Sequence, residues 1–113
     1  MLIVDDEQFN RMALQIILDS IGFKESENRV EFANNGQKAL DVIIKDVKDN
    51  MGSYCSFDLI LMDCNMPIMD GYESTSLIRE FLYNENLPQP IIVGITGHVE
   101  QAFVKRSINS GMN

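Results

Sequence analysis

The chain has 113 residues, which is enough for one small domain and too few for a second hydrophobic core. Its composition, 45% apolar and 8% aromatic, excludes a disordered chain. Seventeen acidic residues against nine basic ones give a net charge of −8, which argues against electrostatic binding to nucleic acid or to an anionic membrane surface.

The first half of the chain alternates short apolar runs with amphipathic stretches. The opening apolar run stops abruptly at Asp5 and Asp6, which is typical of a buried parallel strand. Apolar residues then recur at helical spacing until Gly22 supplies a stop signal, and turn residues precede the second helical stretch. In order, we predict a strand over 2–4, a helix over 9–21, a strand over 29–33 and a helix over 39–47.

The second half repeats this alternation. Its most apolar strand candidate ends at Asp63, and Pro67 and Gly71 bracket the connection to the next helix. Another apolar run ends at Thr96. The predicted elements here are a loop over 51–56, a strand over 57–62, a helix around 75–82, a strand over 91–95 and a helix that starts near 99 and ends by 111.

Four strand–helix units in succession predict an α/β fold, a doubly wound parallel sheet with helices on both faces. Ligands in such folds bind outside the carboxyl ends of the strands. Four residues fall at predicted strand ends: Asp5, Asp6, Asp63 and Thr96.

Three carboxylates at one rim would repel one another unless a cation joined them. Oxygen ligands and phosphate chemistry together favour Mg²⁺, which could orient a phosphoryl group for attack by a carboxylate. A lone Asp at a strand end is more often a solvated loop residue or a helix N-cap. The joint placement of Asp5, Asp6 and Asp63 at neighbouring strand ends favours the metal and phosphate interpretation instead.

Three segments carry a family resemblance: Leu2 to Glu7, Leu59 to Gly71, and Ile91 to Gly97. They resemble, in order, the signature segments of response-regulator receiver domains of the CheY-like kind, and they look most like the receivers of hybrid histidine kinases. The resemblance implies a flavodoxin-like three-layer sandwich. It also implies a phosphoacceptor module of a two-component phosphorelay, which takes a phosphoryl group from phosphohistidine with Mg²⁺ and then switches conformation.

Carried over by position, Asp63 matches the phosphoacceptor, and Asp5 and Asp6 match the acidic pair at the metal. The second acid of that pair binds Mg²⁺ directly, and the first acts mainly through water. Asn65 matches the position whose backbone carbonyl completes the metal shell. Thr96 matches the hydroxyl that turns toward the phosphoryl group.

Further positions carry weaker implications. Gly97 matches a small residue that leaves the phosphate accessible, and Asn65 and His98 match positions that tune the lifetime of the phosphoryl group. An equally good interpretation makes His98 a helix N-terminal residue with no special role. Pro67 and Gly71 match the loop that shapes the site, and we interpret them as structural.

The chain departs from the receiver pattern after its fourth helix. The resemblance predicts a fifth strand ending in a Lys and a fifth helix, and residues 1–113 contain neither; Lys105 is no substitute, because it lies in the predicted fourth helix. We therefore expect a receiver domain truncated at its C-terminus. Its fourth strand and the faces of its first and fourth helices should be exposed, which would promote self-association.

Three alternatives stay open. A pseudo-receiver would keep the fold as an interaction module without phosphotransfer. A haloacid-dehalogenase-type phosphatase would need a second acid two residues after its nucleophile, where this chain has Asn65. A flavodoxin-type carrier would need a phosphate loop in place of the acidic residues at Asp5 to Glu7.

We expect a cytoplasmic domain, because there is no signal peptide and no apolar run approaches the roughly 18 residues of a membrane span. A cytoplasmic domain of this kind could also belong to a parent protein that is anchored in a membrane. Cys55 and Cys64 match neither a zinc spacing nor a disulfide framework, and Cys64 reads as a packed residue rather than a redox sensor. The implied partner is a histidine kinase or a histidine phosphotransfer domain, with no nucleic acid. As an enzyme, such a domain would catalyse only its own phosphorylation and dephosphorylation.

Overall fold

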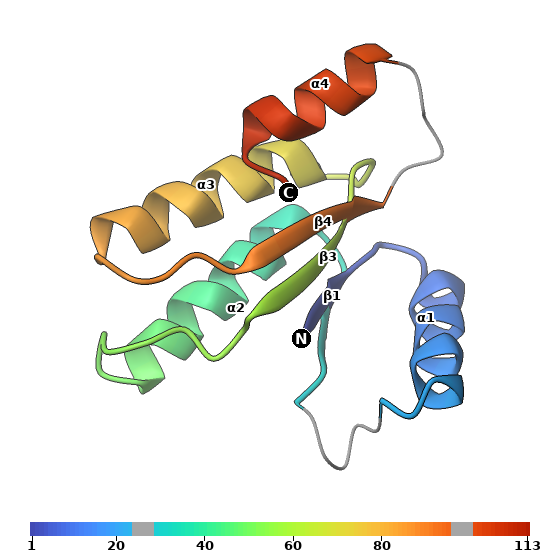
Figure 1. The fold of residues 1–113 in the computed structure, drawn as a ribbon, viewed down its shortest axis with the longest axis horizontal. Helices are drawn as coiled ribbons and strands as arrows, with labels where there is room; N and C mark the ends of the chain where they lie inside the picture. Colours follow the sequence, from blue (N-terminus) through green and yellow to red (C-terminus); the bar gives the residue numbers. More distant parts are fainter. Residues whose placement is uncertain (24–28, 96–100) are drawn as a thin grey trace.

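The computed structural model describes residues 1–23, 29–95 and 101–113, and strands and helices alternate through them (Figure 1). Among the helices of these ranges, none is long and apolar enough to span a membrane. The predicted order of elements is confirmed. The elements are β1 (Leu2–Val4), α1 (Gln8–Ser20), β2 (Glu31–Ala33), α2 (Gly36–Asp49), β3 (Leu59–Asp63), α3 (Gly71–Asn84), β4 (Ile91–Ile95) and α4 (Gln101–Ser110).

The four strands form one parallel sheet in the order β2-β1-β3-β4. In the centre, Leu2 of β1 pairs with Glu31 of β2 on one side and with Ile60 of β3 on the other. The pairing of β3 with β4 continues to Asp63, opposite Ile95. Since β1 and β3 are neighbours, the residues at their carboxyl ends come to the same edge of the sheet.

Two strands begin later than the sequence pattern predicts. We expected β2 to start at Arg29, but it starts at Glu31, because β1 offers only three residues to pair with. We expected β3 to start at Phe57, but it starts at Leu59, where its pairing with β4 begins. Phe57 is buried all the same, and the Arg29 guanidinium lies 4.6 Å from the centre of its ring.

The hydrophobic core lies between the sheet and the helices α2 and α3. Both helices start at a capping side chain: Asn35 accepts the Lys38 N–H at 2.8 Å, and Asp70 accepts the Glu73 N–H at 2.9 Å. Each cap stabilises its helix by about 1 kcal/mol. Alternate strand residues and one stripe of each helix fill the core: Leu2, Val4, Ile60, Met62 and Ile92 from the sheet, Ala39, Ile43 and Val47 from α2, and Ile78 and Leu82 from α3.

Helix α1 lies apart from the sheet, on the opposite side of the strands from α2 and α3 (Figure 1). Its apolar spacing is the predicted one, yet the helix buries no residue, and Phe9 is 78% exposed. Helix α4 also buries none, and β4 is an edge strand on which Ile91 is 55% exposed. The expected exposure of the first and fourth helices is therefore confirmed. The edge of β4 is exposed only in part, because Asn113 accepts the Ile92 N–H at 2.8 Å and donates to the Ile92 carbonyl at 2.8 Å.

Candidate functional site

Three acids meet at the carboxyl ends of β1 and β3. Asp5 and Asp6 follow β1 directly, and Asp63 is the last residue of β3. One carboxylate oxygen from each lies within 4.8 Å of the other two. The prediction that the strand order brings these side chains together is confirmed. Asp5 is buried, Asp6 is exposed and Asp63 is intermediate.

Asp5 is held on several sides. Its backbone N–H donates to the carbonyl of Ala33 at 3.0 Å, and its carboxylate accepts the Glu7 N–H at 2.9 Å and the Asn10 amide at 3.4 Å. The Arg11 guanidinium donates to the Asp5 carbonyl at 2.6 Å. Asn10 and Arg11 were not predicted as site residues from the sequence. The signal was their position in the first turns of the helix that follows the acidic pair.

Asp63 has an environment that disfavours its charged form. Burial, followed by the negative charges of Asp5 and Asp6, raises the pKa of Asp63 to about 6, against the opposing effect of the Asn65 N–H. That N–H donates to the Asp63 carboxylate at 3.2 Å. The carboxylate is thus ionised at neutral pH, but at a cost that a nearby cation would relieve.

The acid cluster fits a hard divalent cation such as Mg²⁺. Carboxylate and carbonyl oxygens are its preferred ligands, and one or two protein carboxylates with several waters complete its shell. Asp6 and Asp63 offer exposed or partly exposed oxygens, while Asp5 is already engaged by Glu7 and Asn10. Asn65, two residues after Asp63, is exposed at the same rim, and the role of its carbonyl stays a prediction.

The loop after Asp63 returns closely against the end of β3. A Cβ atom on Gly71 would lie 2.1 Å from the carbonyl oxygen of Asp63, so only glycine permits this approach. The Gly71 N–H donates to the carbonyl of Cys64 at 3.1 Å, and Cys64 is fully buried. The structural interpretation of Gly71 and the packing interpretation of Cys64 are both confirmed.

Ile68 is the strained residue of this loop. The N–H of Met69 donates to the carbonyl of Pro67 at 2.8 Å, which closes a γ-turn around Ile68 with φ at 72°. A β-branched residue rarely adopts this left-handed conformation. The side chain is also 83% exposed, so packing does not offset the strain.

Three predicted site residues, Thr96, Gly97 and His98, lie outside the described residues. Their roles remain predictions.

Comparison with known proteins gives one family. The family model described as "Response regulator receiver domain" matches residues 1–113. The chain is 34% identical over 112 residues to hybrid signal transduction histidine kinase A of Dictyostelium discoideum, covering 99% of this chain and 5% of that protein. It is 32% identical to two-component response regulator 24 of Arabidopsis thaliana, covering 99% of this chain and 68% of that protein.

Solved structures agree with the fold. The receiver domain of the histidine kinase CKI1 from Arabidopsis thaliana, in complex with Mg²⁺, superposes with a TM-score of 0.84 at 31% identity, over 98% of this chain and 77% of that one. The receiver domain of Ssk1 from Saccharomyces cerevisiae, crystallised with the histidine phosphotransfer protein Ypd1, gives a TM-score of 0.78 at 26% identity, over 99% and 72%. The chain spans only about a twentieth to a tenth of the length of the first histidine kinases that it matches.

Proposed function

Because the chain belongs to the response regulator receiver domain family, we propose that it accepts a phosphoryl group from a phosphohistidine onto Asp63. The observation that carries the proposal is the meeting of three carboxylates, with oxygens within 4.8 Å of one another, at the carboxyl ends of β1 and β3. One of the three, Asp63, is partly exposed, so an incoming donor could reach it.

Asp63 supplies the nucleophile. With a pKa of about 6, its carboxylate is mostly ionised at neutral pH. One carboxylate oxygen forms a bond to phosphorus while the phosphorus–nitrogen bond to the donor histidine breaks and its electron pair returns to the imidazole. The Asn65 N–H, 3.2 Å from the Asp63 carboxylate, holds the side chain in place for this attack.

Mg²⁺ would be held by Asp6, Asp63 and the backbone carbonyl of Asn65, with Asp5 in support through water. When bound, it would neutralise charge on the phosphoryl group. The Mg²⁺ complex of the CKI1 receiver supports the choice of Mg²⁺ as the cation. The raised pKa of Asp63 supports it from this chain's own residues, because its causes include the negative charges of Asp5 and Asp6.

Four further roles belong to the proposal. The Thr96 hydroxyl donates to a phosphoryl oxygen, and Gly97 leaves room for that group. Asn65 and His98 tune how long the phosphoryl group survives. These roles rest on the positions of the four residues relative to Asp63 and to the end of β4 in the family pattern.

The partner is a histidine phosphotransfer domain or a histidine kinase, and the complex of Ypd1 with the Ssk1 receiver supports the first. The conformational switch that follows phosphorylation belongs to the same proposal. Self-association is a further part of it. Its support is the exposed apolar surface on α1 and β4, where Phe9 is 78% and Ile91 55% exposed.

Acetyl phosphate with Mg²⁺ tests the acceptor. One phosphoryl group should appear in the intact mass, Asp63→Asn should abolish it, and Asp6→Asn should slow it by weakening the metal. Asp58→Asn is the matched control, because it removes an exposed acid just before the opposite end of β3. Undiminished labelling of the Asp63→Asn protein would show that the acceptor is assigned wrongly.

A further inference from the structure

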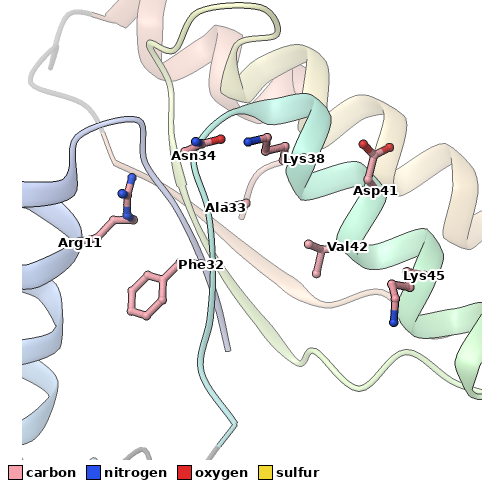
Figure 2. Close-up of a pocket in the computed structure, with 8 residues that line it drawn as sticks. All are labelled: Arg11, Phe32, Ala33, Asn34, Lys38, Asp41, Val42 and Lys45. Carbon is pink, nitrogen blue, oxygen red and sulfur yellow. The ribbon is translucent and has the colours of Figure 1, made fainter.

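A cavity of about 430 Å³ lies at the β2 edge of the sheet, between α1, β2 and α2 (Figure 2). Its volume is in the range of sites for small organic ligands. None of the three rim carboxylates lines it. The lining residues are Arg11, Phe32, Ala33, Asn34, Lys38, Asp41, Val42 and Lys45.

The cavity is basic in an acidic chain. Three cations and one carboxylate line it, which gives a formal lining charge of +2 (three minus one) in a chain of net charge −8. Three of the nine basic residues of the chain are therefore gathered here. A concave surface of one sign attracts ligands of the opposite sign.

Two of these cations have side-chain N–H donors that are not used in hydrogen bonds within the described residues. Lys38 has no side-chain partner in residues 1–23, 29–95 and 101–113, and Figure 2 shows it reaching from α2 toward Asn34. Arg11 extends from α1, and one of its five N–H donors donates to the Asp5 carbonyl. Lys45 is less available, because its ammonium lies 2.8 Å from Asp49. Arg11 and Lys38 therefore offer charge-assisted hydrogen bonds to an anionic group.

The rest of the lining suits an aromatic ring. Phe32 is 41% exposed, and its ring extends from β2 on the side of α1, near Arg11 (Figure 2). An exposed aromatic face stacks on planar ring systems, and Val42 lines the cavity on the other side of β2, from α2 (Figure 2). The Asp41 carboxylate accepts from the Gln37 amide at 3.0 Å and can also accept from hydroxyl or amino groups of a ligand.

We propose that this cavity binds a mononucleotide, with the phosphate at Arg11 and Lys38 and the base against Phe32. A nucleotide joins the two chemistries that the lining presents, a phosphate and a flat ring. A nucleic-acid strand is disfavoured, because the chain as a whole carries −8 and would repel a polyanion. The site is separate from Asp63 and does not depend on phosphotransfer.

Titration of the ¹⁵N-labelled chain with AMP, without Mg²⁺, tests the proposal by NMR. Saturable shifts should centre on Arg11, Phe32 and Lys38. Lys38→Gln should weaken AMP binding about tenfold, since it removes a charge-assisted hydrogen bond. Phe32→Leu, which keeps apolar bulk but loses the flat ring, should also weaken it, and Lys48→Gln, an exposed lysine of α2 outside the cavity, should not.

Inorganic phosphate is the second arm, and Asp63→Asn is the second variant. We expect phosphate alone to bind more weakly than AMP, and the Asp63→Asn chain to bind AMP with unchanged affinity. Equal affinity for phosphate and AMP would overturn the role of Phe32. Loss of AMP binding in Asp63→Asn would place the nucleotide at the acid rim, and the absence of saturable shifts would refute the site altogether. None of these results bears on phosphorylation of Asp63.

Discussion

Removing the charge of Asp63 should stabilise the folded chain at neutral pH. Burial and the nearby acids raise the pKa of Asp63 from 3.8 to about 6, so the folded protein binds this proton more tightly than the unfolded chain does. Stability must then fall as pH rises from about 4 to about 6, and it stays lower above that window. An asparagine has no such titration and can keep the hydrogen bond from the Asn65 N–H.

The size of the effect follows from the shift. The difference between 3.8 and about 6 corresponds to about 3 kcal/mol at full weight. The carboxylate is partly exposed, and solvent screening reduces this to about 1–2 kcal/mol. We therefore expect Asp63→Asn to gain about 1–2 kcal/mol over the wild-type chain at pH 7 and to gain almost nothing near pH 4.

Urea unfolding of both chains across this pH range measures the difference, and taking the difference cancels the titration of groups that do not interact with Asp63. Mg²⁺ should stabilise the wild-type chain more than the Asp63→Asn chain, because the variant loses one metal ligand. Asp58→Asn controls for the loss of one negative charge elsewhere. A variant less stable than wild type at pH 7, or a difference that does not change with pH, would refute the assigned environment of Asp63.

Three further substitutions are tested by urea unfolding, two in the loop beside the site and one near the amino ends of β2 and β3. Gly71→Ala should cost about 3 kcal/mol or more, because its Cβ would lie 2.1 Å from the Asp63 carbonyl oxygen; a normal stability would refute that contact. Ile68→Asn should gain about 0.5–1 kcal/mol, because asparagine tolerates the left-handed φ of 72°; a loss would mean that Ile68 packs against the fold. Asp46→Asn should cost about 1–2 kcal/mol at pH 7, because it weakens the 2.8 Å pair with Arg29. Burial alone would raise the pKa of Asp46, but its hydrogen bonds with Ser56 and Arg29 together lower it. The stability that ionised Asp46 contributes is therefore present at neutral pH and is lost as pH falls through the lowered pKa. A loss of stability in Asp46→Asn that grows toward acid pH would contradict this.

The acid cluster was predictable because it depends only on which strands are neighbours in the sheet. Parallel strands end at one edge, so Asp5, Asp6 and Asp63 had to meet once the strands were assigned and β1 and β3 were neighbours. The glycine at 71 was also interpretable, because a close backbone approach leaves few other choices of residue.

Contacts between distant segments were not predictable. From the sequence, Asp46 is indistinguishable from the other solvated acids of the second helix. In the structure its side chain is only 3% exposed and accepts from Arg29 and from the Ser56 N–H. The hydrogen bond from Arg11 to the Asp5 carbonyl depends on how α1 leaves the sheet. Helical spacing predicts an apolar face but not what covers it, which is why α1 shows the right pattern and no buried residue.

The central claim, phosphotransfer from histidine to Asp63, is tested most directly by mixing the chain with a ³²P-phosphorylated histidine phosphotransfer domain in the presence of Mg²⁺. We expect label to move from the donor to this chain as a hydroxylamine-sensitive acyl phosphate. Asp63→Asn should leave the label on the donor, while Asp58→Asn should accept it normally. Label that reaches the Asp63→Asn chain as readily as the wild type would contradict the claim.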